Sequence, residues 1–521
     1  MAGDNVEEAS GVQLPRRLLD VGEKDDTSVR LVLSNGRTGK YATLSHCWGP
    51  KEMQPVRTLT GNLNQFLTDI PADILSNSKT FQDAITVTRE VGLRYLWIDS
   101  LCIVQDDNTD WKQEAAMMGE IYQNSHLTII AAYAENGRAG CFYDRSLLQS
   151  PPIVHVPYID KHGSVSGTMQ IKAKLIDYSI QSHPINCPTS DRAWITQEER
   201  LSRRKIYYTK QSMFWACREL EIYETNETSP FEPKEWVWKQ IVKDYTVRKL
   251  TFQADKLVAL QGLAGVMQKC RTQDRYHVGL WLKDLPDDLL WFGQREQLES
   301  ITDSAIPSWS WASRKGPVSF LEFDPFNTYQ HERYSVSLDE HNNLTLNCPI
   351  FPIVYAKDPT AVKSWTREEA MGTKILGSIT PWPLGIRDIL ITFREKSGIR
   401  FHPMFEWLAN QLQSARSPLF GFSVHRTYIV TDLLKVAMGY ATLDDANRER
   451  STDEEIYHCA VVRKGGKTNE DQRRFYYVLL LQDESQKMVG NPDLENLTRV
   501  GVGIIISNWM DDLRSMRFRI R

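Results

Sequence analysis

The chain has 521 residues, of which 41% are hydrophobic and 25% are charged, and its formal net charge is −4. Such a length is more than one hydrophobic core usually holds, and it predicts two or three globular domains. The sequence contains no stripe of basic residues, which argues against binding to DNA or RNA.

The sequence contains no recognisable targeting or membrane segment. The first residues, MAGDNVEEASGVQLPRRLL, lack the apolar core of a signal peptide. No later window approaches the ~20 consecutive apolar residues of a membrane-spanning helix. We therefore expect a cytoplasmic protein. The eight cysteines are scattered and form no C-x-x-C pair, so we expect buried free thiols and no disulfide scaffold.

The first predicted elements precede residue 100. Two β-rich runs within 29–49 flank Asn35-Gly36, a dipeptide that favours a two-residue turn, and together they predict a hairpin. Apolar residues at helical spacing predict a helix over 80–92. The run YLWI at 95–98 then predicts a short buried strand.

A second helix and a further strand continue this alternation. Asp110 and Gln113 have the spacing of a capping box, which predicts that the second helix begins at Asp110. The run LTIIA at 127–131 predicts another buried strand. Alternating strands and helices are typical of an open, mostly parallel sheet covered by helices. The predicted fold class of this region is therefore α/β.

Polar residues follow two of the predicted strands. Asp99 comes directly after the strand YLWI, and Ser45, His46 and Cys47 come directly after the strand YATL. In open α/β sheets, ligands bind beyond the carboxyl ends of the strands. If the two strands are neighbours, these side chains share one crevice, which is the first physical reason to expect a site there.

The pattern changes in the second part of the chain. Alternating apolar residues within 150–190 predict extra antiparallel strands. Ser190 or Asp191 is expected to cap a helix over 192–201, and a strand is expected at 205–209. The chain is then expected to be mainly helical to about residue 300 and richer in β-strands from there on.

Three segments of the sequence resemble the fungal heterokaryon-incompatibility (HET) domain family. They are YATLSHCWG at 41–49, residues 93–132 around LWIDSLCIVQDD, and RAWITQEERLSRRKIYYT at 192–209. They occur in the order found in the family. With the patterns above, they give a flexible N-terminus, a HET domain, a helical region packed on it and a β-rich C-terminal domain, with expected bounds at 1–27, 28–222, 223–300 and 301–521.

The resemblance implies a role in fungal non-self recognition and programmed cell death. It also implies a TIR-like, Rossmannoid sheet, because HET domains are thought to be distantly similar to TIR domains, some of which cleave NAD. The chain has no P-loop motif and no repeats, so it resembles a stand-alone member of the family. Some stand-alone members look like cofactor-free enzymes, such as cyclases, of fungal secondary metabolism.

Four residues are candidates for catalysis. Asp99, at a strand end, is a candidate general base, and its structural alternative is to cap the following loop. Glu198 is a candidate general acid or base, or a polyol ligand, and its structural alternative is an ion pair with Arg192. His46 and Cys102 are a candidate base and nucleophile, with a structural histidine and a buried thiol as the alternative.

Five residues of the three matching segments are candidates for substrate binding. Trp48, Trp97 and Trp194 would stack on a flat ligand or stabilise a cationic intermediate, or else pack in the core. Arg192 and Gln197, from the third segment, complete the expected substrate-binding set.

The string DDNTD at 106–110 has the D-D-x-x-D form of a magnesium–diphosphate site. It lies between a strand and a helix, where Asp110 serves better as a cap, so we expect these residues to be structural. A metal site made of His46, Cys47 and Cys102 lacks a second ligand pair. We expect no metal and no cofactor.

Two main functions remain open from the sequence, and a non-catalytic binding module is a third if both Asp99 and Glu198 prove to be salt-bridged and buried. The first is an incompatibility-type effector of programmed cell death, activated by a protein partner. The second is a cofactor-independent cyclase, isomerase or pericyclase that holds a reactive small molecule in a closed apolar pocket touching Asp99, Trp97 and Glu198. A TIR-like NAD hydrolase is a further enzymatic alternative. The expected partner is a small molecule or an activating protein, with no nucleic acid and no membrane span.

Overall fold

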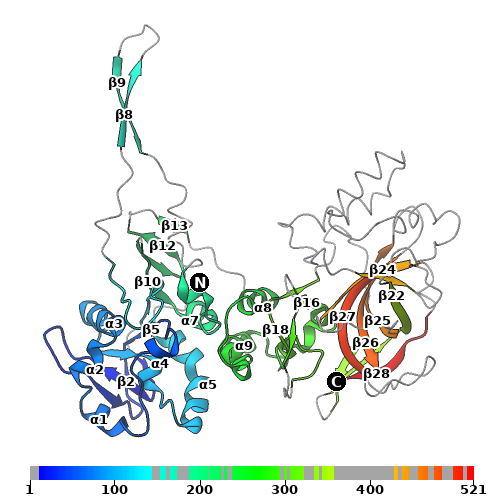
Figure 1. The fold of residues 1–521 in the computed structure, drawn as a ribbon, viewed down its shortest axis with the longest axis horizontal. Helices are drawn as coiled ribbons and strands as arrows, with labels where there is room; N and C mark the ends of the chain where they lie inside the picture. The colour runs from blue at the N-terminus through cyan, green and yellow to red at the C-terminus, as the bar shows by residue number, and fades with distance from the viewer. Residues whose placement is uncertain are drawn as a thin grey trace. The chain divides into compact units, whose positions relative to one another are not determined.

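The computed structural model describes residues 11–143, 153–159, 165–172, 187–210, 212–224, 228–230, 237–293, 298–301, 306–321, 334–339, 343–356, 428–431, 437–444, 456–467, 474–483, 497–507 and 513–521. The chain divides into two compact units (Figure 1). The first unit comprises Met1–Glu235 and Arg248–Met267, and the second comprises Trp236–Val247 and Gln268–Arg521. Residues 1–10 of the predicted flexible N-terminus lie outside the described residues.

A nine-stranded sheet forms the centre of the first unit, in the order β13-β12-β11-β10-β7-β5-β6-β2-β3. The central strands β10, β7, β5 and β6 run parallel, whereas the strands at both edges are antiparallel to their neighbours. The strands are β2 (Arg17–Asp20), β3 (Arg30–Leu33), β5 (Tyr41–Ser45), β6 (Tyr95–Trp97), β7 (Leu127–Ile130), β10 (Arg204–Tyr208), β11 (Met213–Cys217), β12 (Leu220–Tyr223) and β13 (Thr228–Pro230). The α/β class is confirmed, but the sheet is mixed rather than mostly parallel, because antiparallel strands extend the parallel centre at both edges.

Helices connect the central parallel strands, as the sequence predicts. α3 (Lys79–Glu90) connects β5 to β6, and α5 (Asn108–Asn124) connects β6 to β7. α3 ends before Gly92, whose φ of 73° favours glycine. All five residues of β5 are buried, as expected for a parallel strand that helices cover.

The hairpin predicted around Asn35-Gly36 is wrong, although the turn itself forms. Asn35 and Gly36 have φ values of 50° and 75°, which suit a tight turn. The strands on either side of this turn pair with the preceding segment and not with each other. β3 pairs with β2, and β4 (Thr38–Gly39) pairs with β1 (Val12–Gln13). The local turn signal does not determine strand pairing here because β1 and β2 supply the partners for both flanks.

α5 begins earlier than predicted. The Asp107 carboxylate accepts hydrogen bonds from the backbone N–H groups of Thr109 at 2.8 Å and Asp110 at 3.2 Å, so Asp107 is the N-cap. The capping box predicted at Asp110 is therefore wrong. Asp110 is buried in the first turn, where it forms an ion pair with Arg17.

α7 (Ile195–Leu201) lies within the predicted helix over 192–201. Trp194 occupies the N-cap position and makes no side-chain capping bond. The predicted cap at Ser190 or Asp191 is wrong, because both residues belong to the preceding 3₁₀ turn η3 (Pro188–Asp191). The sequence signal was therefore correct for the helix and wrong for the residue at which it begins.

The first unit contains further short elements and one close helix contact. α9 (Val258–Cys270) approaches α5 at Gly119 and Gly262, where a Cβ on Gly119 would lie 2.5 Å from the Gly262 Cα. The antiparallel pair expected within 150–190 is confirmed as β8–β9. The other elements are η1 (Lys51–Met53), α1 (Leu63–Thr68), α2 (Ala72–Ser76), α4 (Asp99–Cys102), β8 (Ile153–Ile159), β9 (Val165–Lys172) and η4 (Gln253–Asp255).

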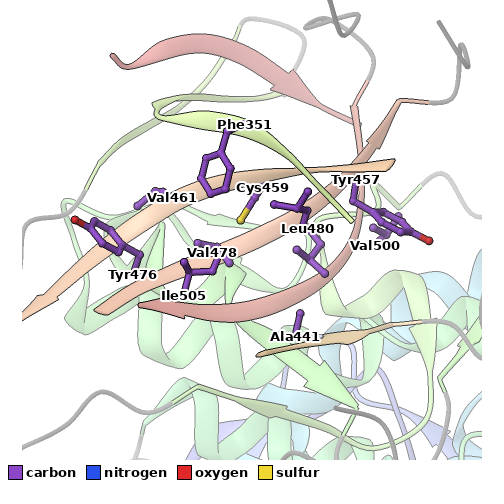
Figure 2. Packing of buried hydrophobic residues seen from close by; sticks show 11 residues of the cluster. Phe351, Ala441, Tyr457, Cys459, Val461, Tyr476, Val478, Leu480, Val500 and Ile505 are labelled. Atoms are coloured by element: carbon purple, nitrogen blue, oxygen red, sulfur yellow. The ribbon is translucent and has the colours of Figure 1, made fainter. Parts of the chain in front are cut away.

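The second unit is rich in β-strands, as predicted for the C-terminal region. Its main sheet has the order β20-β21-β28-β27-β24-β23-β22-β25-β26, and β26 also pairs with β27, so six of the strands form a closed ring. Buried side chains from these strands, among them Phe351, Tyr457 and Val478, pack together (Figure 2). The strands of this sheet are β20 (Ser335–Leu338), β21 (Leu344–Cys348), β22 (Ile350–Ala356), β23 (Tyr428–Thr431), β24 (Ala437–Leu443), β25 (Ile456–Lys467), β26 (Arg474–Asp483), β27 (Leu497–Ser507) and β28 (Met516–Ile520).

The region predicted to be mainly helical contains both helices and strands. α8 (Trp238–Thr246) belongs to the second unit, and short strands follow from residue 276 onward. These short strands are β14 (Tyr276–His277), β15 (Leu280–Trp281), β16 (Trp291–Gly293), β17 (Glu299–Ser300), β18 (Arg314–Lys315) and β19 (Val318–Phe320), with 3₁₀ turns η5 (Leu282–Asp284), η6 (Asp287–Leu289) and η7 (Trp311–Ser313) between them. In the described part of the chain, no helix is both long and apolar enough to cross a membrane.

Candidate functional site

The carboxyl ends of β5 and β6 lie side by side. The two strands are parallel neighbours, with Tyr41 opposite Tyr95 and Thr43 opposite Trp97. The residues that follow them, His46 after β5 and Asp99 after β6, therefore share one edge of the sheet. The adjacency of the two strands, on which a site at this edge depends, is therefore present.

Asp99 is oriented by three groups at this edge. The indole N–H of Trp48 donates to Asp99 Oδ2 at 3.0 Å, and the backbone N–H of Ser100 donates to Oδ1 at 2.7 Å. Arg192 Nη2 lies 4.0 Å from Oδ2. The Asp99 side chain is 13% exposed. Its carboxylate is therefore held in place by the protein while part of it stays accessible.

His46 is a neutral imidazole in a closed environment. Its ring is buried, and it packs edge-on against Phe81 of α3 at 5.2 Å between ring centroids. Burial lowers the pKa of His46 to about 4, although Asp99 Oδ1 lies 3.9 Å from its Nδ1. Among the described residues, neither ring nitrogen has a hydrogen-bond partner. His46 is therefore not the charged partner of Asp99 at neutral pH.

Cys102 is a buried thiol at the end of α4. Its sulfur accepts a hydrogen bond from the backbone N–H of Ile98 at 3.5 Å, and burial raises its pKa to about 12. A thiol with such a pKa is protonated at neutral pH and is a weak nucleophile. Within the described ranges, no hydrogen bond joins Cys102 to His46. The structure thus does not bring together the predicted nucleophile and base.

Arg192 and Glu198 extend the site from the segment around α7. The Arg192 guanidinium donates to the backbone carbonyl of His46. Burial disfavours the Arg192 charge, yet the carboxylates of Glu198 and Asp99 raise the pKa of this side chain above its usual value. Arg192 is therefore influenced by two acids, one at a strand end and one on a helix. Of the two, Asp99 lies within ion-pair distance of its guanidinium.

Glu198 is almost completely buried, with 1% of its surface exposed. Burial raises its pKa, and Arg192 and the hydroxyl groups of Ser45 and Tyr122 offset only part of this increase. Within the described part of the chain, Glu198 Oε2 has no hydrogen-bond partner. A buried carboxyl with a raised pKa is a proton donor or acceptor closer to neutral pH than an ordinary glutamate.

Tyr122 belongs to the same group of side chains, although its place in the sequence does not predict a site residue. Its hydroxyl donates to the Leu44 carbonyl at 3.1 Å, and its ring packs edge-on against Trp97 at 5.7 Å. Burial and the nearby Glu198 raise the pKa of Tyr122. In the sequence, Tyr122 is only one of several apolar residues on a predicted helix face. No local signal distinguishes it from core residues.

The remaining predicted binding residues differ in exposure. Trp97 is fully buried, whereas Trp48 and Trp194 are half-buried. Gln197 is also buried. Its Oε1 packs so closely against Gly262 that a Cβ added to this glycine would lie 2.8 Å from the oxygen. Trp97 therefore packs in the core beside Tyr122. Trp48 is the tryptophan that contacts a candidate catalytic group directly.

The acidic string at 106–110 is engaged by the protein itself. Asp106 accepts hydrogen bonds from the backbone N–H and the hydroxyl of Thr60, both at 2.8 Å. Asp107 caps α5, and Asp110 pairs with Arg17. These contacts confirm the structural role expected for the string. Across the described residues, no group of three or more His, Cys, Asp or Glu side chains is arranged to hold a metal ion.

Comparison with known families supports the resemblance seen in the sequence. Residues 41–198 match the family described as Heterokaryon incompatibility protein (HET). The match begins at the first residue of β5 and ends at Glu198, so it contains both strand ends and the candidate site. No curated protein and no solved structure matched the chain.

Proposed function

Since residues 41–198 form a HET domain, we propose that the protein is a cytoplasmic incompatibility-type effector that arrests growth or causes cell death when a partner activates it. The family match supports the general role. The alternation of β5, α3, β6, α5 and β7 supports the TIR-like, Rossmannoid arrangement that forms part of this proposal.

The observation that carries the proposal is the position and environment of Glu198. Its buried carboxyl has a raised pKa and lies beside Arg192, which also faces Asp99 at the end of β6. Two carboxylates in different environments can divide the tasks of acid and base. In our proposal, Glu198 transfers a proton to or from the bound substrate. Asp99 orients the substrate group that reacts, and Arg192 holds both carboxylates.

The test is induced expression in a fungal host with colony growth as the readout. We expect arrest with the wild type and normal growth with Asp99→Asn and with Glu198→Gln. Asp73→Asn changes an exposed acid of α2 outside the site and should arrest growth like the wild type. Harmless expression of the wild type would contradict the effector role. Arrest by Glu198→Gln at equal protein level would contradict the role of the site.

One observation also favours a second function, that of a cofactor-independent enzyme acting on a reactive small molecule. The Trp48 indole contacts Asp99, so an aromatic surface and a carboxylate lie together at the strand ends. Such a pair can hold a flat substrate against an acid–base group. If wild-type expression is harmless, metabolite extracts of strains with and without the gene should differ, and Glu198→Gln should abolish the difference.

A further inference from the structure

A pocket of about 550 Å³ lies in the first unit near the amino end of β5, and its lining includes none of the Asp99, Arg192 or Glu198 side chains. Residues 13–16, the turn at 33–36, Tyr41 and one side of α5 line it. This volume is within the usual range of about 300–1,000 Å³ for ligand sites. The residues of the proposed acid–base chemistry do not line this pocket, so we consider a separate role for it.

Two apolar side chains form walls of this pocket and are unusually exposed. Leu33, at the end of β3, is 42% exposed, and Met117, on α5, is 47% exposed. Both line the pocket, although they are far apart in the sequence. Single exposed apolar residues are common, but two that line one concave site indicate a contact surface for an apolar group.

The pocket carries negative charge. Glu120 is exposed on α5, and in the described part of the chain it forms no ion pair. Glu120 and the buried Tyr41 both line the pocket, and the charge of Glu120 adds to burial in raising the pKa of Tyr41. Arg16 also lines the pocket, but its Nη1 forms an ion pair with Asp110 Oδ1 at 3.0 Å. Among the described residues, Glu120 is therefore a lining carboxylate without an ion pair, and it can bind a cation.

Amide side chains complete the lining. Gln13 comes from β1, and Gln113 and Asn124 come from α5. Each amide side chain can donate and accept hydrogen bonds. It can therefore bind both the C=O and the N–H groups of a peptide backbone. Gln113, Met117, Glu120 and Asn124 are spaced three or four residues apart, so they form one stripe of the helix.

We propose that this pocket binds a short segment of a partner protein in which a Lys or Arg stands next to an apolar residue. The basic side chain pairs with Glu120, the apolar side chain packs between Leu33 and Met117, and the amides bind the backbone. The inference does not depend on the proposed acid–base chemistry, because it concerns binding alone and involves none of the residues of that site.

The test is binding of the full chain to an array of hexapeptides that carry one Lys or Arg among Leu, Ile, Val, Met and Phe. A matched array carries Glu in place of the basic residue. We expect the basic array to bind selected sequences and the acidic array to bind none. Added salt should weaken binding, because the Glu120 contact is exposed. Calorimetry on the best peptide then gives its Kd.

Three variants assign the binding to the pocket. Glu120→Gln should raise the Kd about tenfold, as expected for the loss of one charge-assisted contact. Met117→Ser should also weaken binding, whereas Glu90→Gln, an exposed acid at the end of α3, should leave the Kd unchanged. Circular dichroism checks that each variant is folded.

Three outcomes would overturn the assignment. They are an array without a single binder, a Kd that Glu120→Gln does not change, and hexylamine binding as tightly as the best peptide. The last result would make a small organic amine the occupant of the pocket. Growth arrest is not measured in this experiment, so its result is separate from that of the proposed function.

Discussion

Two clusters of ionisable side chains lie in the same unit and differ in how far their polar atoms have partners. The Arg17 cluster consists of Arg16, Arg17, Asp110 and Glu114, and the Asp99 cluster consists of His46, Asp99, Arg192 and Glu198. In the Arg17 cluster, Asp110 pairs with both arginines and also accepts the backbone N–H of Val104 at 2.9 Å.

The Asp99 cluster is satisfied only in part. Among the described residues, both nitrogens of His46 and one oxygen of Glu198 have no hydrogen-bond partner, although all three atoms are buried. Buried polar atoms without partners destabilise a fold, so an arrangement that retains them suggests a role other than stability. We infer that the Arg17 cluster maintains the fold and that the Asp99 cluster serves the activity.

The largest expected effect is the loss of the buried arginine in the Arg17 cluster. Arg17→Met removes the buried one of the two arginines that pair with Asp110, and also the hydrogen bond from Arg17 Nε to the Cys102 carbonyl. We expect the free energy of unfolding to fall by about 3–5 kcal/mol, because Asp110 and Glu114 stay buried and keep only the exposed Arg16 as a cationic partner. Urea unfolding measures this change.

A substitution in the Asp99 cluster should change the free energy of unfolding much less. Asp99→Asn keeps the size of a partly exposed side chain, so its effect on the free energy of unfolding should stay below about 1 kcal/mol. The double variant Arg17→Met/Asp110→Asn is the control. Its loss of unfolding free energy should be smaller than the losses of the two single variants added together. Equal losses from Arg17→Met and Asp99→Asn would break the distinction between the clusters.

One residue from each cluster, Glu198 and Asp110, should also respond to pH with opposite signs. Burial raises the pKa of Glu198 above its ordinary 4.5, so the folded protein holds this proton more tightly than the unfolded chain does. The contribution of Glu198 to stability is therefore full below pH 4.5 and is lost as the pH rises through the folded pKa. Relative to Glu198→Gln, the wild type should become less stable as the pH rises from 4.5.

Asp110 gives the opposite case. Burial alone would raise its pKa, but hydrogen bonds from Arg17 and Val104 lower it below the ordinary 3.8. Its contribution is therefore present above pH 3.8 and is lost as the pH falls through the folded pKa. Unfolding free energies of the wild type, Glu198→Gln and Asp110→Asn across this pH range provide the measurement. The same sign for both residues would contradict the burial and partners described here.

The smallest effect concerns the cap of α5. Asp107→Ala removes the two hydrogen bonds that the carboxylate accepts from Thr109 and Asp110, and it should reduce the free energy of unfolding by about 1 kcal/mol. The neighbouring Asp106 is exposed and accepts two hydrogen bonds from Thr60 without capping the helix, so Asp106→Ala should have a smaller effect in the same urea titration. A larger effect at Asp106 than at Asp107 would show that the cap is assigned to the wrong residue.

The elements near the site follow from short-range patterns in the sequence. β6, β7 and α3 correspond to the apolar runs and helical spacing that predict them. Their alternation predicts parallel strands, and parallel strands place Asp99 and His46 at one edge. Local patterning and one rule of topology are therefore sufficient for the strand side of the site.

The errors come from contacts between distant segments. Asp110 looks like a cap because its partner Arg17 lies 93 residues away in the sequence. The pattern around Asn35-Gly36 contains no information on the pairing of its flanks with β1 and β2. Likewise, Tyr122 becomes part of the site only because the segment around α7 brings Glu198 to it. Such contacts depend on tertiary packing, which no local motif encodes.

The most direct test of the central claim measures two properties of Glu198→Gln together. Growth arrest is scored in the fungal host, and the free energy of unfolding is measured on the purified variant at neutral pH. We expect arrest to be lost while the variant is at least as stable as the wild type, because the amide removes a buried charge. Arrest that persists at an equal protein level would contradict the claim that the Asp99 cluster serves the activity.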